Sequence, residues 1–196
     1  MKVDVKTIDG KKMTQRAATE PVGSALRIAP GFVATATDDT TGIETTLEAH
    51  YDADASRYIV TTIVSRGIRP GFDEVALRHT APQAILQIAI PHCIAVHLAN
   101  EGKHAWVTIA ELSQSEGRII PQWMAAEVVK RGSKNERMEV IQILYGASAL
   151  AGLPPTKTVQ LELNVPHRTA SDWIGKARTA GLLKGMSYTP GRQADD

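Results

Sequence analysis

Residues 31–67 contain three short runs rich in Val, Ile, Thr and Tyr, which read GFVATATDD, GIETTLEAHYD and SRYIVTTIVSRG. These residue types favour strands, and the clusters DDTTG and DADAS between the runs supply the Asp, Gly and Ser that turns use. The pattern therefore predicts a meander of about three antiparallel strands. A loop follows, in which Pro70 and Gly71 interrupt regular structure.

From residue 82 the apolar residues recur at helical spacing, as Ile85, Leu86, Ala89 and Ile90. Pro91 must kink or end this helix, because its ring removes a hydrogen bond and clashes with the preceding turn. The following segment HAWVTIAEL favours a strand over a short helix. Another helix is expected to begin near Pro121 and to stop near Gly132.

The last part of the chain is predicted to be helical, with Asn135 as the first cap. Three helices are expected, over residues 135–152, 154–163 and 166–180. The first turns one apolar face inward, formed by Met138, Ile141, Leu144 and Tyr145. Asn164, between the second and third helices, suits the left-handed backbone of a tight turn.

The third of these helices has two distinct sides. Its apolar stripe, at positions i, i+3, i+4 and i+7, consists of Ala170, Trp173, Ile174 and Ala177. The residues expected to face this stripe are Val159, Leu163 and Val165. The opposite side is short, polar and partly cationic, with Arg168, Ser171, Asp172 and Gly175. A helix that reads base edges needs such a side, although an ordinary surface helix of a small bundle has one too.

The segment PPTKTVQLELNVPHRTASDWIGKARTAGLL resembles a helix-turn-helix DNA-binding unit of the trihelical type. The resemblance implies that the second helix packs across the DNA backbone and that the third lies in the major groove. A strand-rich part followed by such a unit also resembles uncharacterised regulators of high-GC bacteria and their phages. Two residues depart from the pattern: Gln160 replaces a small residue where the helices cross, and Asp172 would repel phosphate.

Charge is concentrated in the same region. The whole chain has a net charge of +1, whereas residues 154–192 contain six basic and two acidic residues, a local charge of +4. Basic residues would contact phosphates and release counterions, although a solvated basic surface has the same composition. The candidate DNA-binding residues are Thr156, Lys157, His167, Arg168, Thr169, Ser171, Asp172, Lys176 and Arg178. Arg168 is the strongest, because a guanidinium matches guanine with two hydrogen bonds. Trp173 is expected to be structural.

The fold class expected is α+β, with a small antiparallel sheet and helices followed by an all-helical unit. The expected organisation, in order, is a flexible arm (1–28), a β-rich dimerisation or sensor domain (29–115), a connecting helix (116–134), the helix-turn-helix domain (135–185) and a flexible tail (186–196). The boundary between two separable parts is expected between Ser113 and Ile120.

The sequence offers little support for a metal site, a disulfide or a catalytic site. The single cysteine, Cys93, lies in an apolar run and excludes an internal disulfide or a zinc site built on cysteines. His92 and His97 are spaced wrongly for ligands on one helix, and Asp52 and Asp54 fit a turn better than a calcium loop. No catalytic motif is recognisable, so we expect neither enzyme activity nor a cofactor.

The sequence therefore predicts a cytoplasmic DNA-binding protein, most simply a transcriptional repressor that binds double-stranded DNA as a homodimer without contacting a membrane. The N-terminal part serves as a dimerisation module, a ligand sensor or a second nucleic-acid surface; any small-molecule effector is unknown. The alternative is a phage or mobile-element packaging protein that uses the same helices without regulating transcription.

Overall fold

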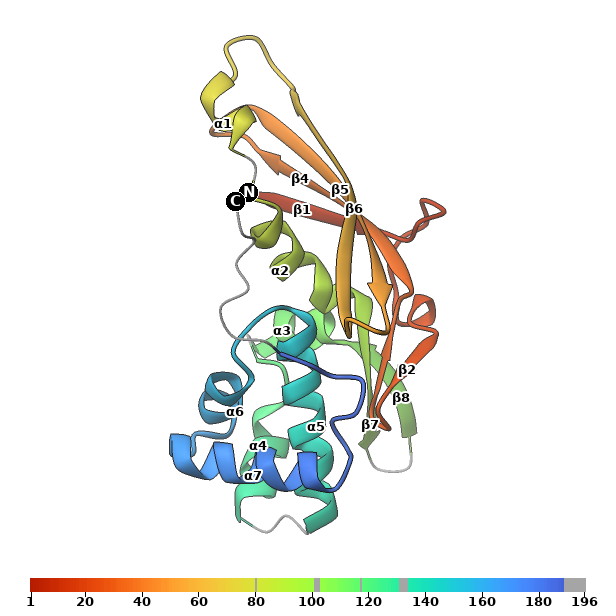
Figure 1. The fold of residues 1–196 in the computed structure, drawn as a ribbon, viewed down its shortest axis with the longest axis vertical. Coiled ribbons are helices and arrows are strands. Elements are labelled where there is room, and N and C mark those ends of the chain that lie inside the picture. The colour runs from red at the N-terminus through yellow and green to blue at the C-terminus, as the bar shows by residue number, and fades with distance from the viewer. Residues whose placement is uncertain (80, 101–102, 117, 131–133, 189–196) are drawn as a thin grey trace.

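The computed structural model describes residues 1–79, 81–100, 103–116, 118–130 and 134–188 (Figure 1). In this part of the chain, seven α-helices pack with two four-stranded antiparallel sheets, so the expected α+β class is confirmed. The long hairpin of residues 43–67 lies toward one end of the molecule, and the helices of residues 122–179 gather at the other (Figure 1).

The first sheet has the strand order β1-β4-β5-β6. Its strands are β1 (Lys2–Lys6), β4 (Gly31–Asp38), β5 (Ile43–Asp52) and β6 (Arg57–Gly67). The meander predicted over residues 31–67 is thus confirmed. Gly42 in the β4–β5 turn has φ of +70°, which few residues other than glycine adopt. The inner face buries Phe32, Ala34, Leu47 and Ala49 completely.

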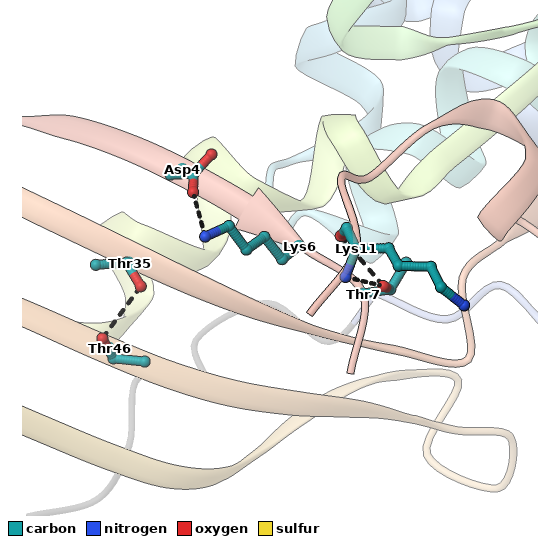
Figure 2. A network of polar contacts seen from close by, with 6 residues as sticks. All are labelled: Asp4, Lys6, Thr7, Lys11, Thr35 and Thr46. Atoms are coloured by element: carbon teal, nitrogen blue, oxygen red, sulfur yellow. Dashed lines mark hydrogen bonds and ion pairs between the residues drawn. The ribbon is translucent and has the colours of Figure 1, made fainter. Parts of the chain in front are cut away.

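The outer face of this sheet carries polar side chains on β1, β4 and β5 (Figure 2). Thr35 on β4 and Thr46 on β5 are cross-strand partners whose hydroxyl oxygens lie 3.1 Å apart. On β1, Lys6 Nζ lies 3.4 Å from a carboxylate oxygen of Asp4. Beyond β1, the Thr7 hydroxyl accepts a hydrogen bond from the Lys11 backbone N–H at 3.0 Å and closes a turn (Figure 2). Alternation of apolar and polar residues therefore sets which side of the sheet faces the core.

The expected flexible arm over residues 1–28 is wrong. β1 pairs with β4, and the 3₁₀ helix η1 (Gln15–Ala17) and strands β2 (Glu20–Val22) and β3 (Leu26–Ile28) follow it. Isolated apolar side chains anchor the segment, and the buried ones include Val5, Met13, Ala18, Val22, Leu26 and Ile28. These elements have five residues or fewer, too few for a periodic pattern, and β1 and β3 are held by pairing with the distant strands β4 and β7.

The second sheet has the order β2-β3-β7-β8, with β7 at Ile94–Asn100 and β8 at Lys103–Thr108. Helix α2 (Pro82–Cys93) contains Pro91 in its last turn and ends two residues later, as its proline predicts. The apolar run then continues as β7, which the helical pattern did not reveal. Helix α2 packs against β1 and β4 of the first sheet and also contacts β7 and β8 of the second sheet.

The segment HAWVTIAEL is divided between two elements. β8 ends at Thr108 and helix α3 (Ile109–Glu116) begins at the next residue. The Glu111 N–H donates to the Thr108 hydroxyl at 3.2 Å, and the Thr108 N–H donates to the Glu111 carboxylate at 2.8 Å. This reciprocal capping explains why the helix starts there. The connecting helix expected over 116–134 is accordingly shorter, because α4 covers Gln122–Lys130.

The remaining helices lie close to their predicted ranges. They are α5 (Lys134–Leu150), α6 (Pro155–Leu163) and α7 (His167–Thr179), and a short α1 (Glu74–Arg78) follows the predicted loop. Asn135 lies inside α5, so it is not the cap. In the described residues, the structure has no helix long and apolar enough to cross a bilayer.

One hydrophobic core joins the strands to the C-terminal helices. The carboxamide of Gln142 on α5, only 1% exposed, accepts a hydrogen bond from the Ser24 hydroxyl at 2.8 Å and donates one to the Leu182 carbonyl at 2.9 Å. Met186 is also buried, although a flexible tail was expected from residue 186; residues 189–196 lie outside the described part. We therefore expect a fragment starting near residue 117 to lack part of its own core.

Candidate nucleic-acid interface

Helices α6 and α7 are joined by three residues, Asn164 to Pro166. Asn164 adopts the predicted left-handed conformation, with φ of 49° and ψ of 49°. The turn is closed by the Val165 N–H, which donates to the Gln160 carbonyl at 3.2 Å. This tight connection fixes α7 at an angle across α6, so that only one side of α7 packs inward.

Three residues of the predicted apolar stripe of α7 are buried, and the fourth, Trp173, is half-buried. Ala170 and Ala177 are completely inaccessible, and Ile174 is 5% exposed. They pack in the same core as Val159, Leu163 and Val165 and the inner face of α5. Helices α5, α6 and α7 contact one another pairwise and so pack as a three-helix cluster. Small side chains on α7 allow this close packing.

The opposite side of α7 faces solvent. The exposed candidates on it are His167, Arg168, Ser171, Asp172 and Lys176, while Thr169 is half-buried at its margin. The structure therefore brings together most of the predicted reading residues on one helix. Thr156 and Lys157 lie apart from them, in the first turn of α6, where unpaired backbone N–H groups also face outward.

Two of the basic candidates have partners within the protein. Lys176 Nζ lies 2.7 Å from the Asp172 carboxylate, so the acidic residue that departs from the pattern is neutralised one turn away. Arg178 is exposed but lies toward α5, and its guanidinium donates to the Tyr145 hydroxyl at 3.4 Å. Arg178 therefore flanks the outward side of α7, which leaves Arg168 as its main cation.

Glu162, the other acidic residue of this region, is removed from the surface. Its side chain is 13% exposed and lies 3.4 Å from the guanidinium of Arg118, and it accepts a hydrogen bond from the Ile119 N–H at 3.2 Å. This pairing could not be predicted from the sequence, because the partners are 44 residues apart. The exposed surface of α6 and α7 is consequently more basic than the composition suggests.

A groove separates α7 from the first part of α5. It is lined by Arg137, Met138, Asp172, Trp173, Gly175, Lys176, Thr179 and Ala180. Arg137 stacks over the ring of Trp173, with its guanidinium carbon 4.8 Å from the ring centroid. Sequence analysis missed Arg137, because only the packed structure places it beside α7.

Gly175 lies in the middle of the outward side of α7. A Cβ at this position would meet no heavy atom within 4 Å, and the backbone is helical. Glycine inside a helix costs about 1 kcal/mol relative to alanine. Neither packing nor backbone geometry in the described chain requires a glycine here. Close approach of another molecule to the helix would require one.

No protein-family model, curated protein or solved structure matches this chain. The described residues contain no group of three or more His, Cys, Asp or Glu side chains arranged to hold a metal ion. The geometry of α5–α7 is therefore the basis on which a function is proposed.

Proposed function

We propose that α5–α7 form a helix-turn-helix unit that binds double-stranded DNA sequence-specifically, with α7 in the major groove. The observation that carries this proposal is the outward side of α7, which is exposed, polar and open at Gly175. A transcriptional repressor is the simplest protein of this kind. A single trihelical unit covers little DNA, so we also propose binding as a homodimer to two half-sites.

Each candidate residue has a place in this arrangement. Arg168, in the first turn of α7, reads a guanine through N7 and O6. Ser171, His167 and Thr169 reach neighbouring base edges or phosphates from the same turns. Asp172 holds Lys176 in place and is positioned to accept from a cytosine amino group. The residues that anchor the unit to phosphates without reading sequence are Thr156, Lys157, Lys176 and Arg178.

Arg168→Ala is expected to weaken binding by about 1–3 kcal/mol at one base position and to relax specificity there. The measurement is a binding titration on duplexes that differ at each position of the preferred site. Arg78→Ala is the matched control, because Arg78 is an exposed arginine on α1 at the far end of the molecule (Figure 1). If both variants bound every duplex as the wild type does, α7 would not be the reading element.

Gly175→Ala is expected to have opposite effects on stability and on binding. The added methyl group stabilises the helix by about 0.5–1 kcal/mol, because alanine has the higher helix propensity. The same methyl group fills the space through which DNA approaches, so the affinity for the preferred duplex falls. Thermal unfolding and a binding titration on one preparation measure both. Unchanged affinity in a stabilised variant contradicts close approach at this residue.

A further inference from the structure

Among the described residues, strand β6 is an edge of the first sheet with no strand partner on one side. It spans 11 residues and pairs with β5 on one side only, at the end of the order β1-β4-β5-β6. From Tyr58 to Ser65 it carries no charged residue. Its exposed apolar side chains are Ile59 at 36%, Ile63 at 45% and Val64 at 55%. A long, uncharged and apolar edge invites pairing with another strand.

Two other sheet edges are protected. β1, at the opposite edge of the same sheet, alternates three charged residues with two valines over Lys2–Lys6. β2, at an edge of the second sheet, has only three residues and contains Pro21, which cannot donate a hydrogen bond. Charge, shortness and proline are the usual means of preventing edge pairing, and β6 has none of them between its terminal arginines.

The backbone of β6 determines how a partner strand would pair. The Ile68 N–H donates to the Gly42 carbonyl at 2.9 Å, so the adjacent pair Ile43–Gly67 is not hydrogen-bonded. Counting alternate pairs from there, Ile63 turns its backbone N–H and C=O away from β5 and toward the outer side of β6.

A bulge at Thr61 shifts this alternation, because Glu48 pairs with Thr62 and Ala49 with Val60. The Tyr51 N–H donates to Pro30 on the β4 side at 2.9 Å, so its partner Tyr58 also turns its backbone toward the free edge. Val60, two residues after Tyr58, also turns its backbone groups toward this edge.

The side chains of β6 are divided between the two faces of the sheet. Ile59 and Val64 pair with His50 and Thr46, which lie on the outer face of the sheet. Val60 and Ile63 pair with the buried residues Ala49 and Leu47, and so belong to the inner face.

We propose that β6 pairs antiparallel with β6 of a second copy, about a two-fold axis between Thr61 and Thr62. In this register Ile59 faces Val64 of the other copy on the outer side, and Val60 faces Ile63 on the inner side. The backbone groups match as well, since Val60 and Ile63 form a hydrogen-bonded pair and Ile59 and Val64 a non-hydrogen-bonded one. The result is a continuous eight-stranded sheet.

Charge at the two ends is balanced in this register. Arg66 forms an ion pair with Glu44 at 2.5 Å, and Arg57 pairs in register with Asp52 on β5. Each end of the two-copy ladder thus combines two arginines with two carboxylates and has no net charge. In this register Arg57 of one copy faces Arg66 of the other, and the two carboxylates offset the repulsion between the arginines. The paired length is about 34 Å for ten residues.

This pairing would give the proposed DNA-binding protein its two-fold axis. The biological role of the dimer rests on the proposed function, whereas the pairing itself does not. Its test needs no DNA, so a failure of dimerisation and a failure of DNA binding are separate results.

Disulfide cross-linking tests the register directly. Non-hydrogen-bonded partners lie about 4.5 Å apart between Cα atoms, within the range of a disulfide. In the double variant I59C/V64C each new cysteine therefore meets its counterpart in the other copy. Within one chain the two are about 15 Å apart and cannot close a disulfide. Cys93 does not compete, because it is 1% exposed and burial raises the pKa of its thiol.

Mild oxidation of the double variant is expected to convert most of the chain into a covalent dimer on a non-reducing gel. The single variants I59C and V64C are matched controls that should remain monomeric on the same gel, because each cysteine then lies about five residues from its copy. Single variants that cross-link as readily as the double variant overturn the register.

Light scattering during size exclusion gives an independent result that needs no cysteine. The wild type is expected to have the mass of a dimer, and V64K that of a monomer. V129K is the matched control, since Val129 is an exposed valine (38%) on α4, outside the first sheet. A monomeric wild type, or a V64K variant that stays dimeric, contradicts the pairing of β6.

Discussion

Gln142→Leu is expected to lower the free energy of unfolding by about 2 kcal/mol, because it removes the two hydrogen bonds of a buried carboxamide, one to the exposed Ser24 hydroxyl and one to the half-buried Leu182 carbonyl. The Ser24 hydroxyl and the Leu182 carbonyl both bond to this carboxamide, which lies within 3 Å of each. Leucine has a similar volume, so the loss comes from the hydrogen bonds and not from a cavity. Urea unfolding followed by circular dichroism measures the change.

The control for this substitution is Gln160→Leu on α6. Gln160 is half-buried, and the structure gives its side chain no hydrogen bond among the described residues. We expect its replacement to change stability by less than about 0.5 kcal/mol, as at most surface positions. Equal effects of the two substitutions would mean that Gln142 does not tie the N-terminal strands to the segment after α7.

Trp173→Ala is expected to destabilise the protein by about 3 kcal/mol, at the lower end of the range for a large aromatic side chain in a core. Trp173 is half-buried, packs against the common core and carries the guanidinium of Arg137 over its ring. Arg137→Ala removes that stacking but keeps the Trp173 ring, and should cost about 1 kcal/mol. Thermal unfolding of the two variants separates packing from the cation–π contact.

Trp123→Ala is the matched control, because Trp123 on α4 is 45% exposed. Its removal should leave stability within about 0.5 kcal/mol of the wild type. The decisive comparison adds a DNA titration to each variant. A Trp173→Ala protein that unfolds like the wild type but has lost DNA affinity would place this ring in the interface instead of the core.

The helices of the trihelical unit and the three-strand meander could be predicted from the sequence because their signals are local. An apolar stripe with a period of 3.6 residues marks α7, and Asn164 marks the turn before it. The strands of residues 31–67 are long enough to show their composition. Exposure of Arg168, Ser171 and Asp172 followed directly from their position opposite the stripe.

The features that could not be predicted from the sequence depend on contacts between distant residues. Strands β1, β2 and β3 have three to five residues each, too few to show a local period. β1 pairs with β4 and β3 with β7, while β2 pairs with β3. The α2–β7 junction lies inside one apolar run. Arg137 and Arg118 reach the C-terminal helices only through tertiary packing. Gln142 is polar and would be expected at the surface, yet two long-range hydrogen bonds allow its burial.

The central claim is that α7 reads DNA sequence. Selection of bound duplexes from a random pool by the full-length protein tests it most directly, with no assumption about the target. We expect enrichment of a pseudo-palindromic site whose half-sites lie about one DNA turn apart, roughly 34–36 Å. The same selection with Arg168→Ala should lose preference at one position of each half-site. A pool that stays random, or a motif that Arg168→Ala leaves unchanged, contradicts the claim.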